Sequence, residues 1–206
     1  MGNRHFIELN PDLMKRFYAA SDHAGATLKG DIIKHLNKQG FEVFDLGSDG
    51  TKSVDYPDYG ATLAEALLRD GDALGIAICG SGIGISIAAN RFSHIRAALV
   101  NDVAAAELSR LHNDANVIAL GERLIDKSTA LNCVDIFANT EFEGGRHCQR
   151  IDKLSDPKPI AAETPESGIG TTTSAQILFS VANCSPKDFL YVYTVLLSTI
   201  LSGLAK

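Results

Sequence analysis

The chain has 206 residues, of which 45% are hydrophobic and 21% are charged. This composition fits one globular domain of ordinary size with some additional sequence, and it excludes disordered and collagen-like chains. The formal net charge of −6 argues against a broad nucleic-acid-binding surface, although a few well-placed arginines are enough to bind a small anionic substrate.

From residue 16 onward, short apolar runs alternate with helical patterns. The first unit is a strand over 16–21 followed by a helix over 25–39, and the second is a strand over 41–47 followed by a helix over 58–70. The third strand, residues 73–79, is continuously apolar, as is typical of a strand buried on both faces. A glycine-rich turn and a helix that ends near residue 92 complete this unit.

Two further units complete the series. Their strands are predicted over 96–100 and 116–120, and their helices over 102–111 and 126–139. Five β–α units in a row predict an α/β fold, in which helices cover both faces of a parallel sheet. Ligands in such sheets bind beyond the carboxyl ends of the strands, near a topological switch point. Polar residues gather at these predicted ends: Ser21, Asp22, His23, Asp45, Cys79, Gly80, Ser81, Asn101 and Asp102.

The two ends of the chain differ from this pattern. We divide the chain into an N-terminal extension over 1–15, an α/β domain over 16–154 and a C-terminal region over 155–206. The extension has no apolar run of the kind that a secretory signal contains. Residues 155–176 have the composition of a linker, and residues 189–205 carry no charge. This apolar stretch predicts either a packed or disordered C-terminal segment or a membrane anchor.

The four cysteines are widely spaced and include no CxxC pair. They are Cys79, Cys133, Cys148 and Cys184. Such spacing is typical of reduced thiols and not of a disulfide framework or a zinc site. We therefore expect a cytoplasmic protein, with membrane association through the C-terminal region as the alternative.

The glycine-rich turn has two interpretations. Gly80, Gly82 and Gly84 resemble a dinucleotide-binding loop, and Asp102 lies at about the distance expected for the acidic residue of that motif. However, Ile85 occupies the position of the third glycine, and the turn follows the third predicted strand and not the first.

The second interpretation gives Cys79 a chemical role. A thiol at the start of a helix lies near the partial positive charge of the helix, which favours the thiolate. The backbone N–H groups of the turn and the hydroxyl of Ser81 are donors for a developing oxyanion. A base beside such donors suits proton abstraction next to a carbonyl group.

Three other segments carry side chains that this chemistry needs. They contain Asp22 and His23, His112 and Asn113, and Arg146 and Arg150. Each pair also has a structural interpretation. Asp22 could cap the following helix, His112 could complement the dipole at a helix C-terminus, and Arg146 and Arg150 could belong to an exposed basic helix start. Two guanidinium groups four residues apart could instead hold a phosphate.

Six motifs together closely resemble the ribose-5-phosphate isomerase B family, which includes galactose- and allose-6-phosphate isomerases. They are SDHAG (21–25), DYPDYG (55–60), CGSGIGISIAANR (79–91), HNDANV (112–117), LGER (120–123) and EGGRHCQR (143–150). The resemblance covers about residues 16–154. It implies a three-layer α/β/α sandwich on a five-stranded parallel sheet, and homodimers or dimers of dimers with active sites shared between subunits. It also implies interconversion of ribose 5-phosphate and ribulose 5-phosphate without a metal or an organic cofactor.

The resemblance also assigns roles to individual residues. Cys79 would move a proton between C1 and C2 through a cis-enediolate, and His112 would open the furanose ring as a general acid. Ser81 and Asp22 complete the catalytic set. The substrate-binding set comprises Asp22 and His23 at the sugar hydroxyls or ring oxygen, Gly80, Ser81, Gly82, Ile83 and Gly84 at the developing oxyanion, Asn113 at the reacting end, and Arg123, Arg146 and Arg150 at the phosphate. His147 is a further candidate for the phosphate site.

The motifs leave several alternatives open. Some family members have a glutamate shortly after the glycine turn and lack the cysteine, whereas here Cys79 is the only candidate base in the loop. The six-carbon phosphates of allose and galactose are alternative substrates, because the related isomerases share most of these motifs. A non-catalytic sugar-phosphate sensor is a further alternative, and it would need the arginines but no base. A nucleotide-binding protein would need the glycines but no base.

Overall fold

A computed structural model of the chain describes residues 15–154 and 157–158, which belong to the first of two compact units, Met1–Lys158. The predictions for residues 1–14 and for most of the C-terminal region, including the apolar stretch 189–205, lie outside the described residues. Within the described ranges, no helix has both the length and the apolar character that crossing a membrane requires.

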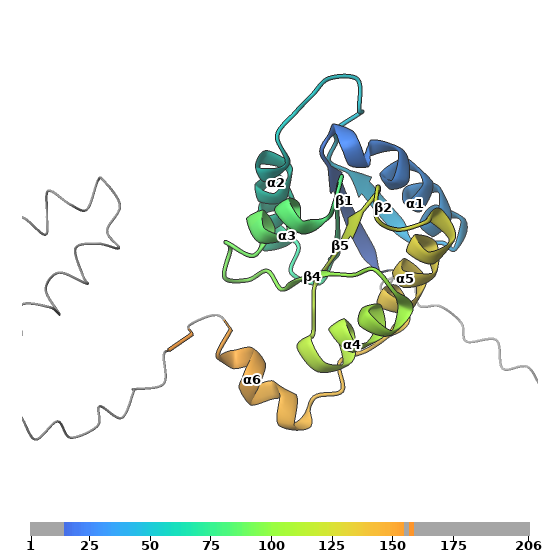
Figure 1. Cartoon of the computed structure of the whole chain (residues 1–206). Helices are drawn as coiled ribbons and strands as arrows, with labels where there is room; N and C mark the ends of the chain where they lie inside the picture. The colour runs from blue at the N-terminus through green and yellow to red at the C-terminus, as the bar shows by residue number, and fades with distance from the viewer. Residues whose placement is uncertain (1–14, 155–156, 159–206) are drawn as a thin grey trace, which may run out of the picture. The chain divides into compact units, whose positions relative to one another are not determined.

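Five parallel strands form one sheet with the order β2-β1-β3-β5-β4 (Figure 1). The strands are β1 (Arg16–Ser21), β2 (Glu42–Asp45), β3 (Leu74–Cys79), β4 (Ala97–Leu99) and β5 (Val117–Gly121). From β1 the chain moves outward to the edge strand β2, and it then returns to add β3 on the other side of β1. The direction of winding therefore reverses between β1 and β3, and this is the topological switch point of the sheet.

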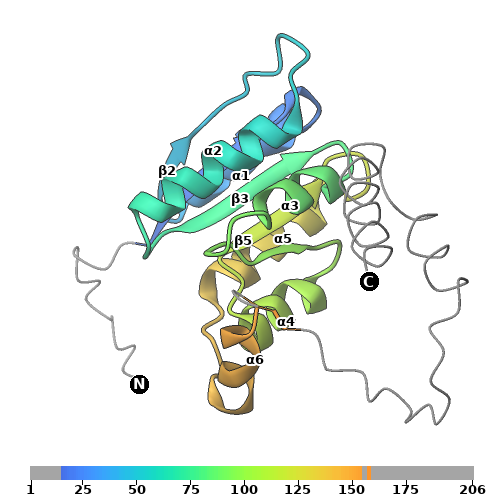
Figure 2. The same ribbon diagram turned by 90° about the vertical axis from the view of Figure 1, so that its left-hand side faces the viewer.

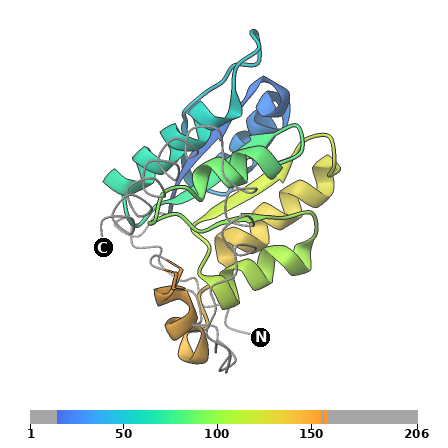
Figure 3. The same cartoon turned by 60° about the vertical axis from the view of Figure 1, so that its left-hand side comes forward.

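Helices cover both faces of the sheet (Figures 1 and 2). Helices α2 (Tyr56–Arg69) and α3 (Ile83–Ala89) pack on one face, and α1 (Ala26–Lys38), α4 (Val103–Asn113) and α5 (Lys127–Asn139) pack on the other. Three short elements complete the domain: η2 (His23–Gly25), η3 (Gly145–His147) and α6 (Cys148–Asp152). Helix α6 buries none of its residues and lies outside both layers (Figure 3).

The side chains of strand β3 alternate between the two hydrophobic cores, one on each face of the sheet. Ile76 and Ile78 contribute to the core under α1, α4 and α5, whereas Ala77 and Cys79 contribute to the core under α2 and α3. This alternation follows from the two-residue period of a strand. It brings Cys79, the last residue of β3, to the face of the sheet on which α2 and α3 lie. The fully buried ring of Phe137 anchors the opposite core, where truncation of a phenylalanine to alanine typically costs about 3–5 kcal/mol.

The predicted α/β/α fold and the five parallel strands are confirmed, with differences at the ends of elements. The second strand spans residues 42–45 and not 41–47. Helix α3 ends at Ala89 and not near residue 92. The reason is that the N–H groups of Arg91 and Phe92 donate to carbonyl groups three residues earlier, so the chain tightens into a turn in place of another α-helical turn.

Candidate active site

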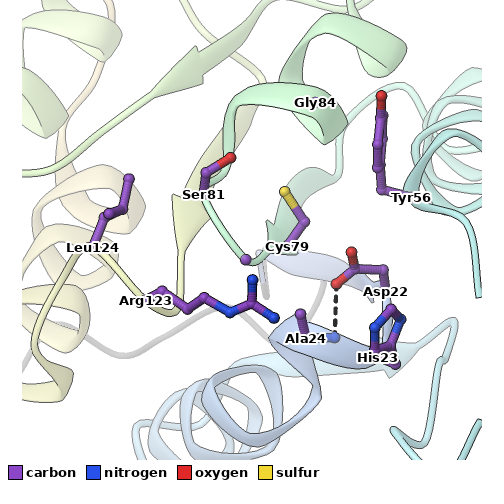
Figure 4. A pocket seen from close by; sticks show the side chains of 10 residues that line it. Asp22, His23, Ala24, Tyr56, Cys79, Ser81, Gly84, Arg123 and Leu124 are labelled. Atoms are coloured by element: carbon purple, nitrogen blue, oxygen red, sulfur yellow. Dashed lines mark hydrogen bonds between the residues drawn. The ribbon is translucent and has the colours of Figure 1, made fainter. Parts of the chain in front are cut away.

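A pocket of about 340 Å³ opens at the carboxyl ends of β1 and β3, at the switch point of the sheet (Figure 4). Its lining residues are Asp22, His23, Ala24, Tyr56, Cys79, Gly80, Ser81, Gly84, Arg123 and Leu124. Segments that are far apart in the sequence thus contribute to one site, as the topology of a doubly wound sheet predicts.

Cys79 lies at the base of this pocket, between Ser81 and Asp22 (Figure 4). This residue is 4% exposed, and the backbone N–H of Gly82 donates a hydrogen bond to its Sγ at 3.1 Å. Gly82 has a φ of 76°, a left-handed conformation that glycine adopts at little cost, and helix α3 begins at the next residue. The thiol is therefore held at a helix start with a backbone N–H directed at its sulfur, which is the environment of many reactive cysteines.

Asp22 both caps a helix and lines the pocket. Its Oδ1 accepts hydrogen bonds from the backbone N–H groups of Ala24 at 2.9 Å and Gly25 at 3.1 Å, which confirms the N-cap interpretation of this residue. These bonds hold the carboxylate of Asp22, a residue that is 7% exposed, at the wall of the pocket beside Cys79 (Figure 4). The neighbouring His23 is exposed, and its Nδ1 lies 3.2 Å from both the backbone nitrogen and the carbonyl oxygen of Val54.

The residues after β5 hold the glycine loop in place. The backbone N–H of Glu122 donates to the carbonyl of Cys79, and that of Arg123 donates to the carbonyl of Gly80, each at 3.0 Å. The Oε2 of Glu122 accepts the backbone N–H of Leu28 at 3.0 Å, which ties this segment to α1. The guanidinium of Arg123 lies in the pocket opposite Tyr56 and supplies a positive charge there (Figure 4).

A second cluster of polar side chains lies outside this pocket. His112, the penultimate residue of α4, stacks on His147 with ring centroids 4.4 Å apart and an interplanar angle of 6°. The Oε2 of Glu143 lies 3.6 Å from Nε2 of His112 and 3.9 Å from Nε2 of His147. The Nε–H of Arg146 donates to Nε2 of His147 at 3.4 Å. Burial, followed by the charges of His112 and Arg146, lowers the pKa of His147 from its ordinary value.

The structure brings together about half of the predicted site residues. Those that line the pocket are Asp22, His23, Cys79, Gly80, Ser81, Gly84 and Arg123, and Gly82 and Ile83 lie in the same loop. The predicted residues that lie outside both the pocket lining and this loop are His112, Asn113, Arg146, His147 and Arg150. Asn113 instead lines a separate pocket beside Arg96, and Arg150 is exposed on α6.

Sequence reasoning missed three residues of the pocket and one of the second cluster. They are Ala24, Tyr56, Leu124 and Glu143. The motifs SDHAG, DYPDYG and EGGRHCQR contain three of these residues but assign no role to them. The ring of Tyr56 packs against the backbone of Gly84, a contact that brings the start of α2 over the glycine loop.

Comparison with known proteins places this architecture in one family. Residues 17–154 match the family described as Ribose/Galactose Isomerase. Ribose-5-phosphate isomerase B of Escherichia coli (strain K12) is 42% identical over 142 residues, which are 69% of this chain and 95% of that protein.

Solved structures agree with this match. The ribose-5-phosphate isomerase B of Clostridium thermocellum is 48% identical, with a TM-score of 0.67 over 68% of this chain and 95% of that chain. The ribose-5-phosphate isomerase B of Mycoplasma genitalium was solved with bound ribulose-5-phosphate and is 42% identical, with a TM-score of 0.66 over 68% of this chain and 93% of that chain.

Proposed function

The chain belongs to the ribose/galactose isomerase family, and we propose that it interconverts ribose 5-phosphate and ribulose 5-phosphate with Cys79 as the base. The observation that carries this proposal is the position of Cys79 in the pocket at the β1/β3 switch point, with the N–H of Gly82 directed at its sulfur. The bound ribulose-5-phosphate in the Mycoplasma genitalium relative supports a sugar phosphate as the substrate class.

In the proposed reaction, the Cys79 thiolate removes a proton from C2 of the open-chain aldose. The electron pair of the C–H bond forms the C1–C2 double bond of a cis-enediolate, and the carbonyl oxygen at C1 takes up the negative charge. The proton of the C2 hydroxyl then moves to the C1 oxygen, and Cys79 returns its proton to C1, which gives the ketose. A carbon acid is much weaker than a thiol, so the base needs donors that stabilise the enediolate oxygen as its charge develops. Ser81 and the backbone N–H groups of the glycine loop lie beside Cys79 and take this role.

The remaining pocket residues would bind the sugar. Asp22 lies beside Cys79 with its orientation fixed by two backbone hydrogen bonds, so it can accept a hydrogen bond from a sugar hydroxyl. His23 lies at the exposed edge, and Arg123 is the cation of the pocket. Because a guanidinium binds phosphate oxygens through two parallel N–H groups, Arg123 suits the anionic end of the substrate.

We further propose that a second copy of the chain completes the site. His112, Arg146 and Arg150 do not line the pocket of their own chain, so ring opening and phosphate binding would be served by those of the partner. Three large apolar residues in or beside the glycine loop are 37–50% exposed: Ile83 and Ile87 of α3, and Leu99, whose side chain packs on Gly82. An apolar surface of this kind is typical of a protein–protein interface, and its position supports contact between copies beside the active site.

The position of Asp102 argues against the dinucleotide alternative. Its Oδ1 accepts the backbone N–H of Ala105 at 2.8 Å and so caps α4. Asp102 also follows β4, which β5 separates from β3 in the sheet. A dinucleotide site needs the acidic residue near the glycine loop, free to bind a ribose hydroxyl. Here Asp102 is neither next to the glycine loop nor free to bind a ribose hydroxyl, because it caps α4.

The test is turnover of ribose 5-phosphate by the full chain, measured beside allose 6-phosphate and galactose 6-phosphate. We expect ribose 5-phosphate to have the highest kcat/KM. Cys79→Ala should lower kcat by about 10²–10⁴-fold, which is the usual contribution of a general base. Cys148→Ser is the matched control, because Cys148 is an exposed thiol outside the pocket, and it should keep full activity. Turnover by Cys79→Ala at the rate of the control would overturn the assignment of the base.

A further inference from the structure

Glu122 joins the start of α1 to the end of β3. It directly follows β5, and its backbone N–H donates to the carbonyl of Cys79 at 3.0 Å. Its Oε2 accepts the backbone N–H of Leu28, in the first turn of α1, at 3.0 Å. One residue therefore contacts both the segment that carries the proposed base and the helix that follows Asp22.

Helix α1 cannot be capped by its own N-cap residue. That residue is Gly25, which has no side chain to accept a hydrogen bond. A Cβ at Gly25 would lie 2.8 Å from the carbonyl carbon and the carbonyl oxygen of Ile78 in β3. Because ordinary contact between heavy atoms begins at about 3.5 Å, the close approach of α1 to β3 requires glycine here. The usual capping residues, Ser, Thr, Asp and Asn, are therefore excluded at this position.

Glu122 supplies the missing cap from 94 positions later in the chain. A capping side chain normally accepts the N–H of the second or third helical residue, and Leu28 is the third residue of α1. Leu28 is 5% exposed, so its N–H would lose its partner in a largely buried environment if the Glu122 side chain were removed. The carboxylate also lies at the end of the helix where the partial positive charge favours an anion.

This cap connects two walls of the pocket. Asp22, His23 and Ala24 form the wall that precedes α1, and the glycine loop with Arg123 forms the other (Figure 4). The second wall is held by the backbone N–H groups of Glu122 and Arg123, which every side chain at these positions would leave in place. A change of the Glu122 side chain therefore loosens the start of α1 against the second wall and leaves the second wall itself intact.

We propose that Glu122 is a positioning residue of the isomerase, which by capping α1 holds Asp22 in the correct place relative to Cys79. This role rests on the proposed function, in which Asp22 binds a sugar hydroxyl and Cys79 removes the C2 proton. Asp22 contacts the sugar both before and during proton transfer. Looser placement of Asp22 therefore raises KM through weaker binding, and it lowers kcat through poorer alignment of C2 with Cys79.

The test compares three substitutions of Glu122 in the full chain, with ribose 5-phosphate as the substrate. A misplacement of 1 Å can cost about 10²-fold in rate, and loss of the cap is a smaller change, so kcat/KM of Glu122→Ala should fall about tenfold with a rise in KM. Glu122→Gln keeps an oxygen that can accept the N–H of Leu28 but has no charge, and it should keep most of the wild-type kcat/KM. Glu122→Asp keeps the charge but is shorter by about 1.5 Å, so it loses the hydrogen bond and should resemble Glu122→Ala.

Asp102→Ala is the matched control. The Oδ1 of Asp102 accepts the N–H of Ala105 at 2.8 Å, so this variant also loses one carboxylate cap, at α4, and Asp102 does not line the pocket. Loss of one cap should lower the melting temperature of both alanine variants by roughly 1–8 °C. A smaller folded fraction lowers the apparent kcat and leaves KM unchanged. A rise in KM in Glu122→Ala that is absent from Asp102→Ala therefore separates positioning from stability.

Two results would overturn the proposal. One is a Glu122→Ala chain with the kcat and KM of Asp102→Ala. The other is wild-type kinetics in Glu122→Asp together with alanine-like kinetics in Glu122→Gln, which would assign the effect to the charge and not to the cap. If the wild-type chain did not convert ribose 5-phosphate, the proposed function would fail and the positioning role with it, whereas faster amide exchange of Leu28 in Glu122→Ala would still show that Glu122 caps α1.

Discussion

Replacing Gly121 with alanine tests whether the position of the glycine loop controls the rate. Gly121 is the last residue of β5, and a Cβ at this position would lie 2.4 Å from the carbonyl carbon of Ser81 and 2.5 Å from its oxygen. Both are backbone atoms, so rotation of a side chain cannot relieve the overlap. Ordinary contact between heavy atoms begins at about 3.5 Å, and the loop or the end of β5 must therefore move by about 1 Å.

The size of the effect follows from this displacement. Moving reacting groups by about 1 Å can cost about 10²-fold in rate, and Ser81 lies beside the proposed base. We therefore expect kcat/KM of Gly121→Ala to fall by about 100-fold. Overpacking also costs about 1–3 kcal/mol, which lowers the melting temperature of a chain of this size by roughly 2–12 °C.

The assay is the initial rate of ribulose 5-phosphate formation by the full chain, with thermal unfolding measured on the same samples. Gly30→Ala is the control, because a Cβ at that position in α1 would meet nothing within 4 Å. It should keep its kcat/KM and gain up to about 1 kcal/mol from the higher helix propensity of alanine. A Gly121→Ala variant as active as Gly30→Ala would show that the position of the glycine loop does not control the rate.

Three further predictions concern charge and thiol chemistry. Arg146→Ala should raise KM more than it lowers kcat, because phosphate contacts form already in the ground state, and an unchanged KM in saturation kinetics would place the phosphate elsewhere. Burial raises the pKa of the Cys133 thiol to about 11, so an alkylating reagent at mildly alkaline pH should modify the exposed Cys148 and leave Cys133 free. Peptide mass spectrometry checks this, and equal labelling would contradict it. Hydrogen bonds from Arg16 hold the pKa of the Asp70 carboxyl below its ordinary value. This pair therefore stabilises the fold above about pH 4, and the stabilisation is lost as the pH falls through the lowered pKa of Asp70. The difference in urea midpoint between the wild-type chain and Arg16→Gln should therefore shrink from pH 7 to pH 3, and a constant difference would contradict the assignment.

The fold class could be predicted because the central strands carry a strong local signal. Strands β3 and β5 are buried at every residue, and their sequences are continuously apolar. The order of the strands could not be predicted in the same way. Strand β4 has only three residues, and its place at the edge depends on pairing with β5, a contact that no local pattern encodes.

The site could be predicted in part for a similar reason. Asp22 directly follows β1, and Cys79 is the last residue of β3, so the parallel sheet alone places them at one edge. Tyr56 had no comparable signal, since it reaches the pocket only through packing on Gly84. His112 and Arg146 were assigned by resemblance, and their own chain holds them in a cluster outside the pocket. Their roles stay predictions that depend on contact between two copies.

The most direct test of the account is the exchange of the C2 hydrogen of ribose 5-phosphate with solvent. The full chain is incubated with ribose 5-phosphate in D₂O, and NMR follows the conversion to ribulose 5-phosphate together with the incorporation of deuterium at C1 of ribulose 5-phosphate and at C2 of the remaining substrate. We expect that the wild-type chain and Cys148→Ser catalyse both conversion and incorporation, and that Cys79→Ala catalyses neither at a comparable rate. Incorporation by Cys79→Ala at the rate of the wild-type chain would contradict the claim that Cys79 is the base.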